Sequence, residues 1–234
     1  MDKILRTDMG AAGGPKMKVD DLGKYAGLGG RALTSAMIAA EVEPTANPLG
    51  AENKLVFAPG LLSGTAAAMS GRISVGCKSP LTGGIKEANS GGQAAQVLAR
   101  LGYAAIVLEG LAPEGKLYQI LINKDGVKIE PADQYKMLPN YDLVDKIKGV
   151  YGDKVTCMSI GPAGEMKLSA SSIAITDMEF RPTRHAGRGG VGAVMGAKGV
   201  KVIIMDDAGI KNREPKDPEK FREANKKWVE GLRS

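Results

Sequence analysis

The sequence predicts an α+β domain that is rich in short strands, and three observations carry this prediction. Short apolar runs of strand length outnumber the stretches with helical periodicity. Helical and strand patterns do not alternate regularly, as a chain of βαβ units would require. The 32 glycines among 234 residues indicate many tight turns and close backbone approaches. This length is enough for one large or two small domains.

The first half of the chain is expected to contain four strands and two helices. The strands are predicted at 3–9, 54–58, 72–79 and 103–110, and the helices at 30–42 and 94–102. The first helix places Leu33, Met37 and Ala40 on one face. Gly102 follows the second helix as a cap at its carboxyl end.

The second half repeats this mixture of elements. Strands are predicted at 116–123, 155–161, 168–176 and 201–207, and helices at 141–152 and 191–198. The dipeptide Asp125–Gly126 indicates a hairpin turn after the first of these strands.

The tail differs from the rest because it is highly charged. Asp217 and Pro218 are typical of a helix start, as N-cap and first helical residue. The apolar stripe of that helix consists of Phe221, Ala224, Trp228 and Leu232. Two interpretations stay open: the chain stops before its next domain, or the stripe packs on this domain or on a partner chain.

Composition excludes several functional classes. The formal charge is +6 and the pI about 9.2, but lysines are scattered and aromatic residues make up only 4%, which argues against nucleic-acid binding. No apolar run approaches the roughly 20 residues of a membrane span, and the start has no secretory signal, so a cytoplasmic protein is expected. Cys77 and Cys157 lie far apart and are expected to be reduced packing residues.

The segment RHAGRGGVGAVMG (184–196) contains a G-x-G-x-x-G pattern, and Asp206 and Asp207 end the apolar run after it. A dinucleotide-binding turn needs a buried strand immediately before its first glycine and further βα units after the acid. The preceding segment is charged and contains proline, and the nearest predicted strand ends at Thr176. We therefore expect no dinucleotide site, and no G-K-[ST] follows that would indicate a P-loop.

An internal comparison is more informative than this motif. Residues 89–110 and 187–207 both run glycine pair, short helix, glycine, apolar strand and acid. Arg72 precedes the first copy, and Arg184 and Arg188 surround the second. A glycine turn at a helix N-terminus is suited to bind an anion, so two copies suggest a ligand with two related anionic halves. The alternative is close packing of backbone on backbone.

Several motifs, in this order, resemble those of a known family. They are GKYAGLGGRAL (23–33), AENKLVFAPGLLSGT (51–65), KSPLTGGIKEANSGG (78–92), SIGPAGE (159–165) and RHAGRGGVGAVMGAK (184–198). Over residues 1–210 the chain resembles the N-terminal domain of the tungsten-containing aldehyde:ferredoxin oxidoreductases. The resemblance implies two pseudo-repeated halves that form a floor for a tungsten bis-pyranopterin cofactor, with Mg²⁺ bridging the two pterin phosphates.

The resemblance also implies cofactor-binding residues in both halves. They are Arg72, Asn89, Ser90 and Gly91 in the first half, and Arg184, His185, Gly187 and Arg188 in the second. The backbone carbonyls of Asn89 and His185 are implied as Mg²⁺ ligands, and the arginines suit phosphate through their forked donors. Position 185 departs from the family, in which a small residue is expected. The bulkier imidazole ring of His185 is therefore expected to come close to the pterin.

The implied reaction oxidises an aldehyde and water to a carboxylic acid and passes the electrons through a [4Fe–4S] cluster to ferredoxin. Such a cluster needs four ligands, which Cys77 and Cys157 cannot supply. Residues 211–234 are therefore interpreted as a charged linker and the start of a helix leading to a missing helical domain or subunit. No catalytic residue is expected here, and a homo-oligomer is compatible with the sequence. The alternative is a stand-alone pterin-binding or interaction subunit without catalysis.

Overall fold

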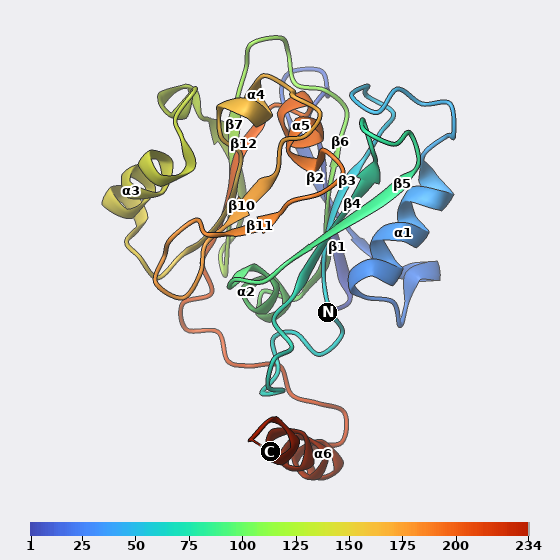
Figure 1. The fold of residues 1–234 in the computed structure, drawn as a ribbon, viewed down its shortest axis with the longest axis vertical. Helices are drawn as coiled ribbons and strands as arrows, with labels where there is room; N and C mark the ends of the chain where they lie inside the picture. The colour runs from blue at the N-terminus through green and yellow to red at the C-terminus, as the bar shows by residue number, and fades with distance from the viewer. Residues whose placement is uncertain (234) are drawn as a thin grey trace.

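Two six-stranded sheets pack face to face in the computed structural model, which describes residues 1–233 (Figure 1). The spatial order of the first sheet is β2 (Lys16–Asp21), β1 (Lys3–Asp8), β6 (Tyr103–Glu109), β3 (Leu55–Pro59), β4 (Ile73–Lys78), β5 (Ile85–Ser90). The order of the second is β8 (Gly126–Pro131), β7 (Tyr118–Asn123), β12 (Val200–Met205), β9 (Thr156–Ser159), β10 (Ile173–Ile175), β11 (Arg184–Ala186). The predicted α+β class is confirmed.

The two sheets have the same topology, which confirms the internal repeat and extends it over each whole half. β1 runs parallel to β6 as β7 runs parallel to β12, and the other neighbouring strands pair antiparallel. The helices also correspond between the halves. They are η1 (Gly23–Tyr25) and η2 (Asp133–Tyr135), α1 (Gly30–Glu41) and α3 (Asn140–Tyr151), and α2 (Ala94–Arg100) and α5 (Val191–Ala197).

The central strands are buried on both faces because each sheet lies between helices and the other sheet. In β3, Leu55 and Phe57 enter the core between the sheets, whereas Val56 packs on the side of α1. In β12, Ile203 enters the core between the sheets, whereas Ile204 packs with residues of α3. Side chains alternate along a strand, so burial on both faces produces the continuous apolar runs seen in the sequence.

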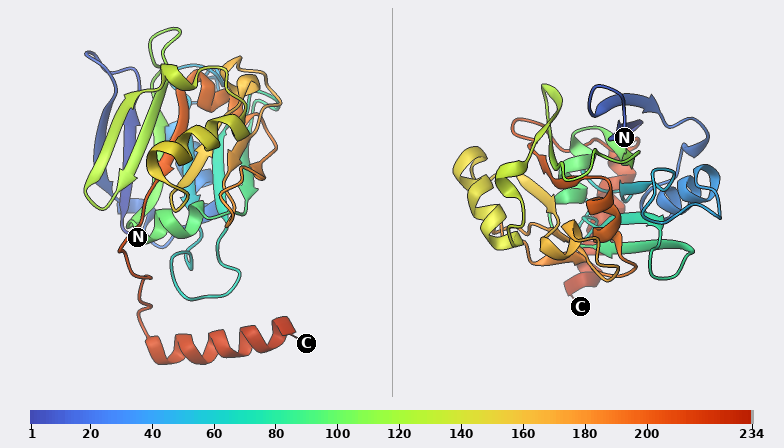
Figure 2. Two further views of the ribbon diagram at one scale, coloured as in Figure 1. Left: turned by 90° about the vertical axis from the view of Figure 1, so that its left-hand side faces the viewer. Right: turned by 90° about the horizontal axis from the view of Figure 1, so that it is seen from above.

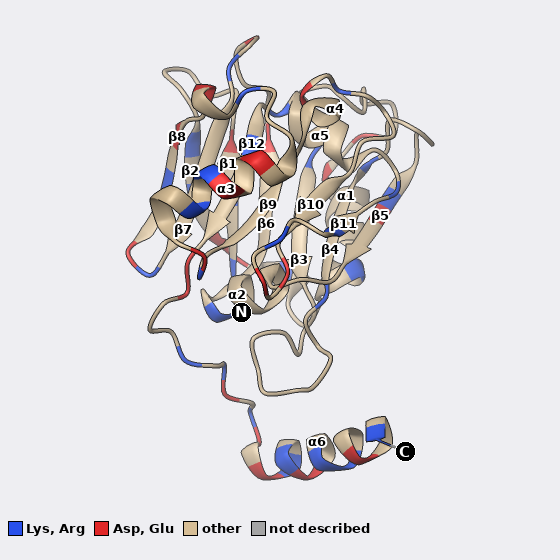
Figure 3. Ribbon diagram, turned by 60° about the vertical axis from the view of Figure 1, so that its left-hand side comes forward, with Lys and Arg blue, Asp and Glu red and all other residues tan. Residues whose placement is uncertain are grey.

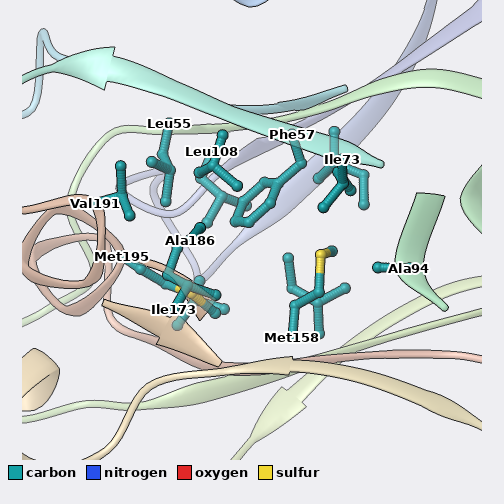
Figure 4. Close-up of a cluster of buried hydrophobic side chains, with 14 of the residues drawn as sticks. Leu55, Phe57, Ile73, Ala94, Leu108, Met158, Ile173, Ala186, Val191 and Met195 are labelled. Carbon is teal, nitrogen blue, oxygen red and sulfur yellow. The ribbon is translucent and has the colours of Figure 1, made fainter. Parts of the chain in front are cut away.

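One hydrophobic core joins the two halves (Figure 4). Phe57 from the first sheet lies opposite Met158 from the second. Met195 of α5 and Ala94 of α2 belong to the same cluster, and α2 contacts strands of both sheets. Burial of each large apolar side chain contributes about 1.5–3 kcal/mol, so this shared core fixes one half against the other.

Four strands were not predicted, β2, β5, β8 and β11, and all four lie at sheet edges; for β8 the sequence indicated only the hairpin turn before it. Edge strands expose much of their surface, and the polar residues found there lack the apolar pattern of a buried strand. The predicted strand 168–176 is wrong over most of its length, because only 173–175 is strand. Lys167, the residue before this segment, has a φ of 57°, which lies in the left-handed region and not in the strand region. The buried face of α1 includes Leu33 and Met37, with Ile38 in place of Ala40.

The carboxyl-terminal helix α6 (Pro218–Arg233) lies apart from the sandwich at the end of an extended segment (Figures 1 and 2). The amide of Lys220 donates to Asp217 Oδ1 over 3.0 Å, which confirms the predicted N-cap. Basic and acidic residues alternate along the helix (Figure 3), and none of its residues is buried. The Trp228 indole donates to the Ala68 carbonyl over 3.1 Å. Between residues 1 and 233 we find no helix both long and apolar enough to cross a bilayer.

A further single turn, α4 (Pro162–Glu165), precedes β10.

Candidate functional site

The two edge strands that carry the predicted site, β5 and β11, lie side by side (Figure 1). Asn89 pairs with Ser74 of β4, and His185 pairs with Ala174 of β10. Ile73 and Ile173 begin their strands and both enter the core, so Asn89 and His185 occupy equivalent positions of the repeat. By the same register, Gly91 corresponds to Gly187.

In the first half, Arg72 is held by a neutral partner. Its Nε donates to Asn89 Oδ1, and Asn89 Nδ2 in turn donates to Ser74 Oγ over 3.3 Å. The guanidinium is exposed, and its positive charge is not balanced by this partner. Ser90 is buried, and its hydroxyl donates to the Gly91 carbonyl over 3.2 Å, so its side chain is already engaged.

The second half presents three exposed basic or imidazole side chains within five residues: Arg184, His185 and Arg188. Among residues 1–233, neither the Arg184 nor the Arg188 guanidinium has a hydrogen-bonding or ion-pair partner. His185 Nδ1 lies 2.9 Å from Ser172 Oγ. By contrast, Arg100 pairs with the carboxylate of Asp207. The predicted arginines therefore carry positive charge that is not neutralised within the part of the chain described here.

A cavity of about 550 Å³ lies between the two halves at one end of these strands. It is lined by Met69, Ser70, Gly71, Arg72, Gly91, Gly92, Gln93, Gln96, Asp177, Met178, Glu179, Arg181 and Arg184. Three predicted residues thus share one cavity, with Arg72 from the first half and Arg184 from the second. Asn89 on β5 and His185 on β11 lie outside this lining and are exposed, as is Arg188, two residues after β11.

The glycines of the two motifs divide into two groups. A Cβ atom at Gly92 would lie 2.7 Å from the Thr176 carbonyl oxygen, and one at Gly190 would lie 2.2 Å from that of Ser169. For these residues the alternative of close backbone packing is correct. A Cβ at Gly91 would approach only Arg72, at 3.9 Å, and one at Gly187 would meet nothing within 4 Å. Neither has a positive φ, so packing within residues 1–233 gives no reason for glycine at these two equivalent positions.

The helix ends are less open than the sequence predicted. The amide of Gln93, before α2, donates to the Thr176 carbonyl over 3.1 Å, and that of Gly192, in α5, donates to Ser171 over 3.1 Å. These donors are occupied by protein, so the positive charge of the site comes chiefly from arginine side chains.

The G-x-G-x-x-G segment is also not a dinucleotide turn. A strand, β11, does precede it directly, which the sequence did not predict. However, β11 and β12 are separated in the sheet by β10 and β9 and run antiparallel. A dinucleotide fingerprint joins parallel strands through its helix, so the rejection holds for a different reason.

Asp177 is a residue of the cavity that the sequence did not single out. Its carboxylate accepts hydrogen bonds from the amides of Glu179 and Arg181, over 2.9 and 3.0 Å, and from the Thr183 hydroxyl over 2.8 Å. Burial raises the pKa of Asp177, but these bonds and the Arg181 guanidinium lower it to about 2. Asp177 lies two residues after β10, and an aspartate at the end of an apolar run is the available sequence signal.

The two cysteines are free and buried in different sheets, as expected for packing residues. Burial raises the pKa of Cys77 to about 12 and that of Cys157 above its usual range. Both thiols are therefore protonated at neutral pH and poor metal ligands.

Residues 4–207 match the family model described as aldehyde ferredoxin oxidoreductase, N-terminal domain. The chain belongs to this family. The tungsten-containing aldehyde ferredoxin oxidoreductase of Pyrococcus horikoshii is 41% identical over 209 residues, which cover 88% of this chain and 33% of the relative. That of Thermococcus kodakarensis is 38% identical over 237 residues, covering 99% of this chain and 37% of the relative.

Two further proteins are similar to this chain at lower identity. The WOR-like subunit of aliphatic sulfonate oxidoreductase from Pyrococcus furiosus is 29% identical over 83% of this chain. A chain of the active site complex BamBC of benzoyl coenzyme A reductase, in complex with 1,5-dienoyl-CoA, superposes with a TM-score of 0.88 at 29% identity. It matches 99% of this chain and 34% of its own length. This chain thus spans about a third of the length of its relatives.

Proposed function

We propose that this chain is the cofactor-cradling part of an aldehyde:ferredoxin oxidoreductase-like enzyme. Residues 1–210 form the cradle, and residues 211–234 lead toward the parts that carry the iron–sulfur cluster and the substrate pocket. The relatives at 38–41% identity are tungsten-containing aldehyde ferredoxin oxidoreductases, which supports an aldehyde as the substrate and ferredoxin as the electron acceptor.

One observation carries the proposal. Arg72, Arg184 and Arg188 have no carboxylate partner within residues 1–233, and they lie near two equivalent glycines that no packing contact requires. Unpaired guanidinium groups favour an anionic ligand, and open glycines permit that ligand to approach the backbone. Each half supplies arginine and one of the two equivalent glycines, although Arg72, before β4, and Arg184, at the start of β11, occupy different positions of the repeat. A ligand with two similar anionic halves fits this arrangement.

A tungsten bis-pyranopterin with two phosphate groups has this character. Arg72 and Arg184 would bind phosphate, Gly91 and Gly187 would allow close approach, and the carbonyls of Asn89 and His185 would face Mg²⁺. When bound, the cofactor supplies a two-electron oxidation in which RCHO and H₂O give RCOOH, two protons and two electrons. This chain contributes position and charge compensation, and no residue of it is assigned as general acid or base.

Magnesium pyrophosphate contains two linked phosphate groups that bind one Mg²⁺. It is therefore a simple model of the proposed ligand and tests the anion site directly. We expect the wild-type chain to bind it in isothermal titration calorimetry. The Arg72→Ala, Arg184→Ala double variant should bind at least about 100-fold more weakly, because each arginine removed loses a hydrogen bond to a charged group worth about 1.5–3 kcal/mol. Its thermal unfolding should be unchanged, since both side chains are exposed. Equal affinity of the two proteins would contradict the assigned roles.

A further inference from the structure

The connection from β10 to β11 is built around one carboxylate. Asp177 accepts five hydrogen bonds: from the amides of Glu179 and Arg181, from Nε and Nη2 of Arg181, and from the Thr183 hydroxyl. Its amide donates to the Arg181 carbonyl over 2.9 Å, which closes the loop on itself. The Asp177 side chain is 9% exposed, so these bonds are shielded from water.

A second feature anchors the same loop from the other side. Phe180 adopts a φ of 59°, which is rare for a residue with a side chain, and its ring is buried in the cluster that packs α3 on the second sheet. Such a conformation persists only where the surroundings enforce it. The loop is therefore held at both the Asp177 carboxylate and the Phe180 ring, and it ends at Arg184, the first residue of β11.

Of the two arginines in this connection, Arg181 is paired with carboxylates and Arg184 is not. The Arg181 guanidinium is neutralised by Asp177 at 3.2 Å and by Glu179 at 3.0 Å. Arg184 lines the same cavity, and its guanidinium has no partner in residues 1–233. Across that cavity, Arg72 is the unpaired cation of the other half.

We propose that Asp177 is a positioning residue of the anion site, which fixes the β10–β11 connection so that Arg184 faces the cavity opposite Arg72. This inference rests on the proposed function for the identity of the ligand. Asp177 does not itself bind the anion, because a carboxylate repels phosphate. Its effect on binding passes through Arg184, as a residue that orients a ligand-binding group affects affinity through that group.

Magnesium pyrophosphate binding to the whole chain tests this role. Replacing Asp177 by alanine should weaken binding about tenfold, the lower end of what loss of an orienting residue costs. The affinity of Asp177→Asn should lie between those of the wild type and Asp177→Ala, because asparagine keeps an oxygen acceptor for the two amides but loses the charge-assisted bonds. In the Arg184→Ala background, Asp177→Ala should have no further effect. Equal losses in both backgrounds would overturn the proposal and indicate a general structural role.

A matched control and a second readout complete the test. Asp207→Ala removes another shielded carboxylate that pairs with an arginine, but outside the cavity, and should leave pyrophosphate affinity unchanged. Without any ligand, Asp177→Ala should speed amide hydrogen exchange over 177–186 and leave exchange in β3 and β12 unchanged. If exchange at 184–186 stays at the wild-type rate, the positioning role is wrong. If the wild-type chain binds no pyrophosphate, the proposed function fails, and the exchange result still decides the role of Asp177.

Discussion

At the residue scale, the glycines at positions 187 and 190 have opposite roles although they lie three residues apart. Gly187→Ala places its Cβ in open space, so the free energy of unfolding should change by less than about 1 kcal/mol. Gly190 has a φ of 73°, and a Cβ there would lie 2.2 Å from the Ser169 carbonyl oxygen, so Gly190→Ala should cost about 3 kcal/mol or more. Urea unfolding of both variants measures this difference. Similar costs would mean that Gly187 is also a packing residue.

The loss of stability at acid pH should depend on Glu41, which lies in a different part of the molecule. Burial raises the pKa of Glu41, but hydrogen bonds from Arg6 and Tyr25 and the charges of Arg6 and Lys54 lower it to about 2. A folded-state pKa below the unfolded value of about 4.5 stabilises the protein above pH 4.5, and this contribution disappears as the pH falls toward 2.

The corresponding experiment compares wild type and Glu41→Gln by urea unfolding from pH 6 to pH 2. The wild type should lose about 3 kcal/mol more than the variant over this range. Parallel pH curves for the two proteins would show that the carboxylate is not the group that titrates.

At the element scale, α4 is tied to the second sheet by a buried ion pair. Lys201 of β12 donates to the Glu165 carboxylate and, over 2.9 Å, to the Leu138 carbonyl; both side chains are nearly inaccessible. The amide of Met137 also donates to Glu165 over 2.9 Å. Glu165→Ala should lower the free energy of unfolding by about 3–5 kcal/mol, because it leaves the ammonium buried and unpaired.

The compensated pair Glu165→Leu, Lys201→Met should recover much of that loss, since no charge then remains buried. Chemical unfolding of the single and double variants measures the difference. A double variant as unstable as Glu165→Ala would show that the hydrogen bonds to Met137 and Leu138, and not the unpaired charge, dominate.

The elements differ in how well the sequence predicts them. β3, β6 and β12 are buried on both faces, and their apolar runs mark them clearly. β5 and β11 lie at edges and carry polar residues, yet they hold Asn89, Ser90, Arg184 and His185 of the predicted site, so pattern analysis misses strands that carry site residues. The site residues followed from a family resemblance, whereas Asp177 needed the folded loop, because its five hydrogen bonds involve residues that no periodicity connects.

At the scale of the whole molecule, the repeat explains why one chain presents two similar halves to one ligand. The glycine segments of the sequence indicated the repeat locally, but the matching strand order of the two sheets appears only in the fold. The shared core between Phe57 and Met158 holds the halves together (Figure 4), and with them the arginines on either side of the cavity.

The central claim is that these arginines retain a tungsten cofactor. The most direct test is elemental analysis of wild type and of the Arg72→Ala, Arg184→Ala variant, both purified natively from cells supplied with tungstate and molybdate. Tungsten, molybdenum, magnesium and iron are measured per chain. The account predicts tungsten and magnesium in the wild type and their loss in the variant, with iron only where a cluster-bearing partner co-purifies. Equal tungsten in the two proteins, at any level including none, would contradict it.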